Sequence, residues 1–317
     1  MSILMECSSK SSSSKPDVGS VDLSDLAIVT VTYNPDLCIL ARQLDQLPVD
    51  SVKIIVDNAS PTDLRAQLQQ LGVAHQAIVL QNDRNVGLAA ALNQGMGYVR
   101  QVRSDCRLVL LLDQDTEPGE LGVAQLAAGY VRAERLAGKP CCVGPRLIDV
   151  ATGLDHGFHQ IRGLRWVRSF PIPGSYKPIS LDNLNGSGTL MPLTLFDQLG
   201  GLEEDFFIDH VDTEWAFRVL ANGYLLYGLP GVVFRHRMGA RSHRFWFLGW
   251  RVWPDRSPLR HYYLFRNAFR LMRRSYVPRV WKVWALAKLT VTFLVHLVFD
   301  RRRTAQIKNM VRGIRDM

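Results

Sequence analysis

Several common signatures are missing from this chain of 317 residues. Its five cysteines form no CxxC pair, so their spacing predicts neither a disulfide framework nor a zinc site and indicates reduced thiols in a cytosolic protein. The signature GxxxxGK(S/T) is absent, which excludes a P-loop NTPase. The apolar run 26–33 continues into YNPDLC, where a nucleotidyltransferase would carry a glycine-rich basic loop, and this argues against that class.

Neither end of the chain has a long uncharged apolar segment. Residues 1–24 are polar and rich in serine without the apolar stretch of a secretory signal, so we expect a disordered leader. The tail 283–300 is apolar, but its longest uncharged run, 289–295, is far shorter than the ~20 residues that span a bilayer. We favour an interfacial helix flanked by Lys282 and the arginines 301–303; the alternative is a helix packed on the protein's own surface.

Basic residues outnumber acidic ones, with 38 Lys and Arg against 29 Asp and Glu. Such an excess suits nucleic acid, a membrane surface or a phosphorylated substrate. It is concentrated in 235–244, 270–279 and 301–303, whereas the first half of the chain is nearly balanced. Because this one-sided charge comes without a nucleic-acid-binding motif, we expect no nucleic-acid partner.

The first half of the chain alternates between strand and helix patterns. Apolar, β-branched runs alternate with segments of helical spacing, and the runs occupy 26–33, 51–57, 76–81 and 107–113. This alternation predicts an α/β fold with a parallel sheet covered on both faces. Further along we expect a strand at 141–148, helices at 192–200 and 211–223, and two short strands around a Pro-Gly turn within 224–236.

Polar residues follow each of the four expected strands. They are Asn34, Asp57, Asn58, Asn82, Asp83, Asn85, Asp113 and Asp115. Ligands of such sheets bind outside the carboxyl ends of the strands, so these side chains line the expected binding edge. Asp113 and Asp115 form a D-x-D pair whose like charges would repel each other without a cation between them. The sequence therefore predicts a Mg²⁺ or Mn²⁺ site that also takes a diphosphate.

Six ordered blocks within residues 26–240 carry a resemblance to a known family. They are TVTYNP (30–35), VDNAS (56–60), NDRNVGLAAALNQG (82–95), LLLDQD (110–115), LNGSGTLM (184–191) and FFIDHVDTEWAFRVLANGY (206–224). The chain resembles the inverting glycosyltransferases of family 2, which have the GT-A fold. This implies a GT-A catalytic domain at 25–245 and a basic, aromatic-rich helical extension at 246–317.

The blocks DHVDTEWAFR and HYYLFRNAFRLMRR (261–274) look most like the bacterial rhamnosyltransferase branch, which uses dTDP-rhamnose to build cell-surface polysaccharide. The resemblance implies L-rhamnose transfer to a saccharide carried by a lipid or by lipopolysaccharide. A UDP-sugar donor is the alternative, and a membrane-docked nucleotide-sugar-binding protein without catalysis is a more distant one. The enzyme would be cytoplasmic and peripheral to the membrane.

The resemblance also assigns roles to individual residues. It places the nucleotide sugar against Asn34, Pro35, Asp57, Asn58, Arg84, Asn85, Gly87, Asp113, Gln114, Ser187 and Gly188. Asp57 corresponds to the carboxylate that contacts the base, and Gly87 to a position where the backbone approaches the ligand. Asp115 and His236 would bind the metal. The arginines at 235, 237, 241 and 244 surround His236 in the sequence and would neutralise the departing diphosphate; the alternative is a solvated loop.

Asp212 matches the catalytic base of the family. The usual pattern there is Glu-Asp, but here Val211 precedes Asp212 and Glu214 follows. Positions 212 and 214 point about 200° apart on a helix, so only one of these carboxylates can face the acceptor. We take Asp212 as the base that accepts a proton from the acceptor hydroxyl, and Glu214 as the other catalytic candidate.

Overall fold

The computed structural model describes residues 22–317 except 173, 238–241, 247–249 and 255, and most of the expected leader 1–24 lies outside these residues. After a short 3-10 turn, η1 (Leu23–Asp25), the described chain builds a nine-stranded mixed sheet in the order β3-β2-β1-β4-β10-β6-β11-β5, with β9 paired to β11. The strands are β1 (Leu26–Thr32), β2 (Val52–Asp57), β3 (Ala77–Gln81), β4 (Leu108–Asp113), β5 (Thr116–Glu117), β6 (Cys141–Asp149), β9 (Ile179–Leu181), β10 (Leu190–Pro192) and β11 (Leu225–His236).

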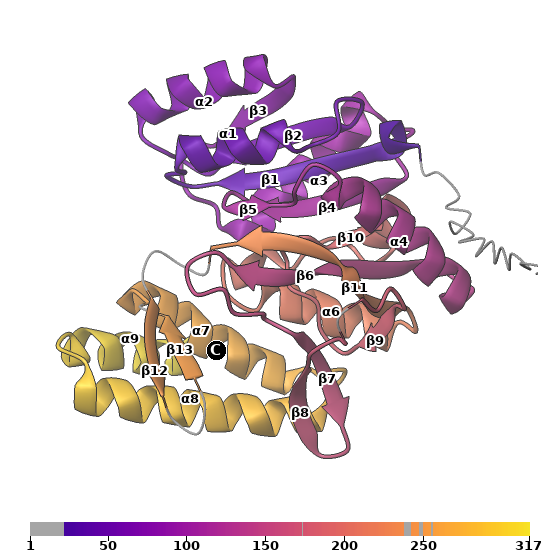
Figure 1. Cartoon of the computed structure of the whole chain (residues 1–317). Coiled ribbons are helices and arrows are strands. Elements are labelled where there is room, and N and C mark those ends of the chain that lie inside the picture. The colour runs from indigo at the N-terminus through magenta and orange to yellow at the C-terminus, as the bar shows by residue number, and fades with distance from the viewer. Residues whose placement is uncertain (1–21, 173, 238–241, 247–249, 255) are drawn as a thin grey trace, which may run out of the picture.

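The α/β arrangement expected from the sequence is confirmed in the first half. Strands β3, β2, β1 and β4 are parallel neighbours, and Val31 of β1 lies opposite Val56 of β2 and Asp113 of β4. Their carboxyl ends therefore meet at one edge of the sheet (Figure 1). Strand β10 interrupts the parallel order because it runs antiparallel between β4 and β6.

Both faces of the sheet are buried under helices. Side chains of β1 alternate between two apolar cores, with Ala27 and Val29 on one face and Leu26 and Ile28 on the other. The second face packs against α1 (Leu37–Asp45), α2 (Thr62–Ala74) and α4 (Gly122–Ala137). The first face packs against α3 (Leu88–Val102), α5 (Leu193–Gln198) and α6 (Val211–Ala221).

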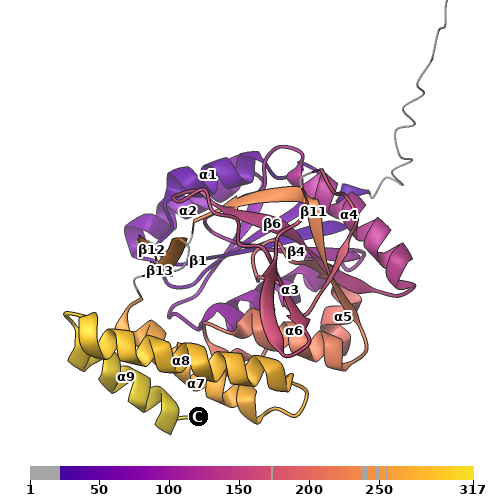
Figure 2. The same ribbon diagram turned by 60° about the horizontal axis from the view of Figure 1, so that its bottom comes forward.

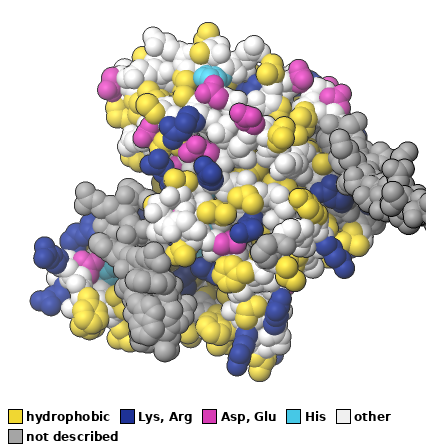
Figure 3. Space-filling model, viewed as in Figure 1, with side chains coloured by type: hydrophobic (Ala, Val, Ile, Leu, Met, Phe, Trp, Pro, Cys, Tyr) yellow, Lys and Arg dark blue, Asp and Glu magenta, His cyan; other side chains and the backbone are white. Residues whose placement is uncertain are grey.

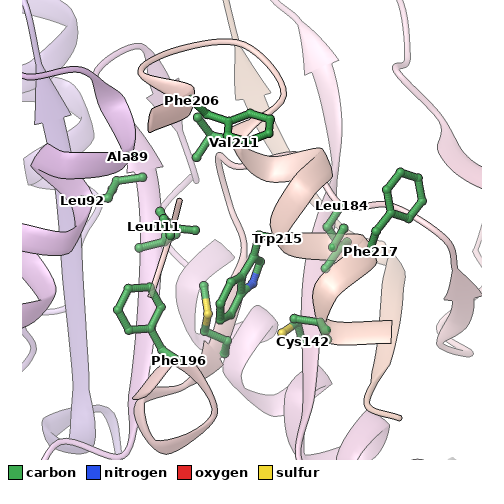
Figure 4. Close-up of a cluster of buried hydrophobic side chains, with 14 of the residues drawn as sticks. Ala89, Leu92, Leu111, Cys142, Leu184, Phe196, Phe206, Val211, Trp215 and Phe217 are labelled. Atoms are coloured by element: carbon green, nitrogen blue, oxygen red, sulfur yellow. The ribbon is translucent and has the colours of Figure 1, made fainter. Parts of the chain in front are cut away.

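Helix α6 is anchored by an aromatic cluster beneath the sheet. Its buried Trp215 lies 5.4 Å from Phe196 of α5 between ring centroids, and Phe217 lies on the same core (Figure 4). Burying a large aromatic side chain stabilises a fold by roughly 1.5–3 kcal/mol, so these contacts fix the helix against the sheet. The first turn of α6, which contains Asp212, is thereby held at a defined place.

The expectation of two short strands within 224–236 is wrong. These residues form one strand, β11, whose pairing with β6 skips from Leu229 opposite Pro145 to Val233 opposite Arg146. The Pro-Gly pair belongs to the intervening residues 230–232, which form an irregularity within the strand instead of reversing the chain. The strand consequently continues as far as His236 beside β5.

The C-terminal part adds three helices, α7 (Pro258–Arg273), α8 (Arg279–Phe299) and α9 (Arg303–Arg315), which lie together beside the sheet layers (Figure 2). Their buried side chains Phe265, Leu271 and Trp281 join the apolar core that contains α6. Two antiparallel ribbons complete the described strands: β7 (Phe158–Arg162) with β8 (Arg165–Ser169), which contacts α8, and β12 (Ser242–Trp246) with β13 (Trp250–Pro254), which lies between β11 and α7 in the sequence.

Helix α8 is buried on one face only. Trp281, Leu289 and His296 are buried, whereas Leu294 and Phe299 are 52% and 79% exposed. Within the described residues α8 is the one helix long and apolar enough to cross a membrane, with a mean hydropathy of 1.5 and 17% of its apolar window buried. A core helix of a soluble protein meets the same criterion of length and composition.

Candidate active site

The carboxyl ends of β1, β2 and β4 are joined by side-chain hydrogen bonds. Gln114 bridges to the main chain of Tyr33: the Tyr33 amide donates to Gln114 Oε1 at 2.7 Å, and Gln114 Nε2 donates to the Tyr33 carbonyl at 3.3 Å. The Asn34 amide donates to Ser60 Oγ at 2.9 Å, with Asn34 in the left-handed region at φ 49°. The expected binding edge is therefore a connected surface, and Figure 3 shows acidic and basic side chains gathered in this part of the molecule.

Asp57 stabilises this edge through buried hydrogen bonds at the end of β2. Its carboxylate is fully buried and accepts hydrogen bonds from Thr32 Oγ1 at 3.1 Å, the Ser60 amide at 3.1 Å and Ser60 Oγ at 2.5 Å. Arg65 Nε lies 3.7 Å away. A buried carboxylate is stable only when it is paired and hydrogen-bonded in this way. Contact between Asp57 and a nucleotide base stays a prediction.

Asn58 shapes the loop after β3. Its Nδ2 donates to Asn85 Oδ1 at 3.0 Å and to the Gly87 carbonyl at 3.1 Å, and its Oδ1 accepts from the Val86 amide at 2.8 Å. Arg84 is exposed at the tip of this loop. Gly87 has φ +90°, and a Cβ there would lie 2.6 Å from the Phe207 ring, so the loop can meet the second half of the chain only with glycine at this position.

Asp113, Asp115 and His236 come together at the ends of β4 and β11. His236 Nε2 lies 4.0 Å from Asp113 Oδ2, and His236 Nδ1 lies 3.4 Å from Asp115 Oδ1. Thr116 Oγ1 is 2.8 Å from Nδ1 of the same ring and 2.6 Å from Ser187 Oγ, so a chain of hydroxyl groups orients the imidazole. One ligand atom from each of the three residues fits within a 4.8 Å cluster.

The electrostatics of this cluster favour a divalent cation. Burial raises the pKa of Asp115 to about 6, and the neighbouring charge of Asp113 adds to the effect, while His236 opposes it. Two carboxylates and an imidazole are ligands that Mg²⁺ or Mn²⁺ accepts, with the remaining positions left to water and phosphate oxygens. The donor set therefore fits the metal expected from the sequence, and the D-x-D pair is joined by a histidine more than 120 residues away in the chain.

Ser187 and Gly188 close the cluster from the strand β10 side. Ser187 Oγ accepts from the Asp113 amide at 2.9 Å, and the Gly188 amide donates to the Leu111 carbonyl at 2.8 Å. Gly188 has φ +84°, and a Cβ there would lie 2.6 Å from Pro145 Cγ. The segment before β10 consequently packs directly along β4, which brings residue 186 towards helix α6.

Asp212 opens α6 next to this segment. Its carboxylate accepts from the Gly186 amide at 3.3 Å and from its neighbour Thr213 at 2.8 Å. Burial raises the pKa of Asp212 to about 6 against these hydrogen bonds, and the charge of Asp113 raises it further. Gly186, which donates to Asp212, directly precedes Ser187, which accepts from the Asp113 amide, so Asp212 lies beside the metal-ligand cluster. The raised pKa of Asp212 is typical of a general base.

Glu214 points away from this site. It is fully buried, and both its oxygens accept from Arg218 at 2.8 Å, while Tyr276 Oη donates to Oε1 at 2.7 Å. Arg218 in turn donates to the carbonyls of Leu199 and Gly201. Glu214 therefore ties α6 to the turn after α5 and to the connection between α7 and α8. Of the two carboxylates weighed as base, Asp212 is the one beside Asp113.

Helix α7 supplies residues that the sequence patterns did not single out. The loop between η2 (Glu204–Phe206) and α6 has left-handed backbone at Asp209 (φ 62°) and His210 (φ 66°), a conformation that costs non-glycine residues roughly 1–3 kcal/mol. Asn267 Nδ2 donates to the Phe206, Ile208 and Asp209 carbonyls at 2.6, 2.9 and 2.9 Å. Arg260 binds the Asp209 carboxylate through two contacts of 2.8 Å. A polar residue on the mostly apolar face of an amphipathic helix is the one signal in the sequence that points to Asn267.

Residues 28–133 match the sequence profile described as Glycosyl transferase family 2. Over 258 residues the chain is 30% identical to the dTDP-rhamnosyl transferase RfbF of Shigella flexneri, which covers 80% of this chain and 82% of that protein. This match extends over the larger part of both chains. It therefore includes regions beyond the residues matched by the family profile.

Solved structures share the fold at low sequence identity. The mannosyltransferase PcManGT of Pyrobaculum calidifontis, in complex with GDP-Man and Mn²⁺, superposes with a TM-score of 0.53 at 15% identity over 91% of this chain and 73% of that one. TarS 1–349 of S. aureus gives 0.51 at 16% identity over 91% and 79%. GalNAc-T7 with UDP, GalNAc and Mn²⁺ gives 0.56 at 15% identity, and this chain spans 86% of its own length but 57% of that structure. With this fold and the match to RfbF, the chain belongs to glycosyl transferase family 2 and is a glycosyltransferase with the GT-A fold.

Proposed function

We propose that this glycosyltransferase moves L-rhamnose from dTDP-rhamnose to a saccharide acceptor of cell-surface polysaccharide or lipopolysaccharide, with inversion at the anomeric carbon. The observation that carries the reaction type is the segment 186–187, because the Gly186 amide donates to Asp212 and Ser187 Oγ accepts from the amide of Asp113, in the acidic cluster formed by Asp113, Asp115 and His236. A base beside a cation site is the arrangement that a single displacement needs. The choice of donor is supported by the similarity to a protein named a dTDP-rhamnosyl transferase.

The donor lies, in this proposal, along the binding edge between the loop 82–87 and the acidic cluster. Asp115 and His236 hold Mg²⁺ or Mn²⁺, and Asp113 faces the ribose. The cation, when bound, supplies positive charge that stabilises the departing nucleoside diphosphate. Arg237 lies close enough to Asp115 to lower its pKa and adds positive charge, and the side chains of Arg241 and Arg244 lie outside the described residues.

The acceptor approaches the opposite face of the sugar. Asp212 takes the proton of the acceptor hydroxyl while that oxygen forms a bond to the anomeric carbon and the bond to the diphosphate breaks. Because the two bonds lie on opposite faces of the sugar, one displacement inverts the configuration. The Gly186 amide and Thr213 hold the Asp212 carboxylate in place for this step.

A donor-binding titration with a product analysis tests this proposal. Titrating dTDP-rhamnose and a panel of UDP-sugars by calorimetry, each with and without Mn²⁺, should show the tightest, metal-dependent binding for dTDP-rhamnose. NMR of the product should show inverted anomeric configuration. Preferential binding of a UDP-sugar would replace the donor assignment, and a retained configuration would contradict the mechanism.

The outward face of α8 supports a peripheral position on the inner face of the cytoplasmic membrane. Its exposed apolar side chains are Val283, Trp284, Leu286, Val291, Leu294, Leu297, Val298 and Phe299. The arginines 301–303 follow directly and are exposed. An apolar stripe with a basic end is typical of a helix that lies in an anionic interface. Flotation with anionic vesicles, compared with neutral ones, tests this, and equal flotation with both would exclude the electrostatic part.

A further inference from the structure

A small hollow lies beside the segment 186–187, which joins Asp212 to the acidic cluster. Residues of β6, of the start of β7 and of the segment 183–187 line it. The hollow is partly open and has a cavity volume of about 10 Å³, which is room for about one water-sized group such as a hydroxyl. It can therefore receive one polar group of a ligand, but it is too small for a whole sugar ring.

Asn183 brings an unsatisfied amide group to this hollow. The residue is buried, with 7% of its surface exposed, and among the described residues its Oδ1 has no hydrogen-bond partner. A buried amide oxygen without a partner costs stability, so native proteins rarely keep one unless a ligand or a water satisfies it. A half-turn of the amide exchanges its oxygen and nitrogen, and a hydroxyl both donates and accepts. A hydroxyl therefore suits Asn183 in either orientation.

The neighbouring strand β7 holds the backbone of Asn183 in place. Asn183 pairs with His159 in an antiparallel bridge, and the Asp182 amide donates to the His159 carbonyl at 3.1 Å. The Asp182 carboxylate accepts from the Ile161 amide at 2.6 Å, which ties the same segment to β7 a second time. Because its backbone is already fixed, Asn183 can bind a ligand without first being ordered.

The lining of the hollow is uncharged. His159 stacks on Trp166 with 5.4 Å between ring centroids. Burial lowers the pKa of His159 to about 3, so its imidazole is neutral at pH 7. Pro145 and Phe158 supply apolar surface, and within the described part of the chain no Lys, Arg, Asp or Glu lines the hollow. Such a lining suits the hydroxyl of a neutral ligand, whereas a phosphate would call for arginine or lysine.

The hollow adjoins both sides of the proposed reaction. Ser187, which lines it, accepts from the Asp113 amide at 2.9 Å, and the preceding Gly186 donates to Asp212 at 3.3 Å. In that reaction the transferred sugar lies between the cation, which holds its diphosphate, and Asp212, which activates the attacking oxygen. A hollow beside both Asp113 and Asp212 is consequently placed to receive part of the transferred sugar.

We propose that the hollow receives one hydroxyl of the transferred sugar and that this hydroxyl is hydrogen-bonded to the Asn183 amide. The inference rests on the proposed function and deepens it, because it names a residue that selects the sugar. A site built to hydrogen-bond a hydroxyl rejects a sugar that lacks it, since the protein group is then left buried and unpaired. Asn183 thus distinguishes sugars by one hydroxyl, whereas the acidic cluster binds the diphosphate of the donor.

An apolar side chain of similar size at position 183 tests the inference in the full-length protein. Calorimetry with Mn²⁺ should show that Asn183→Leu weakens dTDP-rhamnose binding about tenfold, the effect of losing one hydrogen bond to a buried group. The affinity for dTDP should stay unchanged, because dTDP lacks the transferred sugar. The melting temperature of Asn183→Leu should not fall, since Asn183 Oδ1 has no partner to lose within the described residues.

Two further variants complete the experiment. Asn183→Ala adds no atoms to the hollow and should give the same selective loss. Asn222→Leu, an exposed change at the C-terminal end of α6, is the matched control and should leave both affinities unchanged. Equal weakening of dTDP-rhamnose and dTDP by both Asn183 variants would show a general disturbance of the binding edge and overturn the inference. Unchanged affinity for both ligands would overturn it too, and a lower turnover in that case would move the hydroxyl to the acceptor.

Failure of this inference can be told apart from failure of the proposed function. The donor assignment is judged on the unaltered protein by its preference among nucleotide sugars, whereas the hollow is judged by the change that Asn183→Leu produces. Normal dTDP-rhamnose binding by both proteins would remove the hollow and leave the donor in place. A preferred UDP-sugar that Asn183→Leu weakens selectively, with UDP binding unchanged, would replace the donor and support the hollow.

Discussion

The donor side and the acceptor side of the site are built in different ways. On the donor side, polar residues stand directly after strands, and parallel pairing of β3, β2, β1 and β4 brings them together. On the acceptor side, the loop before Asp212 takes its shape from α7, through Asn267 and Arg260. The donor side is thus a property of strand order, whereas the acceptor side depends on helices that follow more than 50 residues later.

Because the two sides are built differently, a substitution on one side should leave the function of the other side intact. A change in the acidic cluster should affect donor and metal binding and leave the loop 206–210 intact. A change in α7 should disturb the position of Asp212 and leave the donor site intact. Measuring donor binding and turnover on the same variants therefore tests the division directly.

Replacing the proposed base should have the largest effect. Asp212→Asn keeps the size of the side chain and removes its basicity, so turnover should fall by ~10²–10⁴ while donor binding stays close to normal. Initial rates and calorimetry with dTDP-rhamnose check the two halves of this prediction. Asp63→Asn, an exposed change on α2, is the matched control. Turnover within a few-fold of the starting enzyme would remove Asp212 as the base.

Replacing a metal ligand should act on the donor side. Asp115→Ala removes one carboxylate of the cluster, so Mn²⁺-dependent binding of the nucleotide sugar should weaken by more than the roughly 10–100-fold that is typical of losing a residue hydrogen-bonded to a metal ligand. Chelation of the metal from the unaltered protein should give a similar loss. The thermal stability of Asp115→Ala should not fall, since its carboxylate is crowded by Asp113. Calorimetry that shows the same donor affinity for both proteins would exclude Asp115 as a ligand.

Removing Asn267 should act on the acceptor side. Asn267→Ala leaves three carbonyls without their donor, and buried unsatisfied groups cost about 1–3 kcal/mol each. We expect a lower melting temperature and a reduced kcat, with donor binding retained. Asn309→Ala on α9, whose side chain donates only to a carbonyl of its own helix, is the control. A parallel loss of donor affinity would show that the two sides are coupled.

The same contrast explains how far the sequence could be interpreted. The strands and the residues that follow them are local patterns, and Asp113, Asp115 and the cation site were accessible from them; His236 was reached through the family resemblance. Asn267 and Asp209 are joined across 58 residues, and nothing in either segment alone specifies the contact. Strand β11 was misjudged because Pro230 and Gly231 are also typical of a turn, and only the pairing with β6 absorbs them into a continuous strand.

The pH dependence of turnover distinguishes titration on the acceptor side from titration on the donor side, and its expected effect is the smallest. Burial raises the pKa of Asp212 to about 6, and a base acts only when deprotonated, so kcat should halve near pH 6 and fall about tenfold by pH 5. The pKa of Asp115 is also raised to about 6, but its protonation weakens metal and donor binding instead. Saturating donor and Mn²⁺ therefore suppress the Asp115 effect in kcat and leave it in kcat/KM. A kcat that stays constant from pH 7.5 to pH 5, with kcat/KM falling, would assign the titration to the donor side and leave Asp212 without a kinetic role.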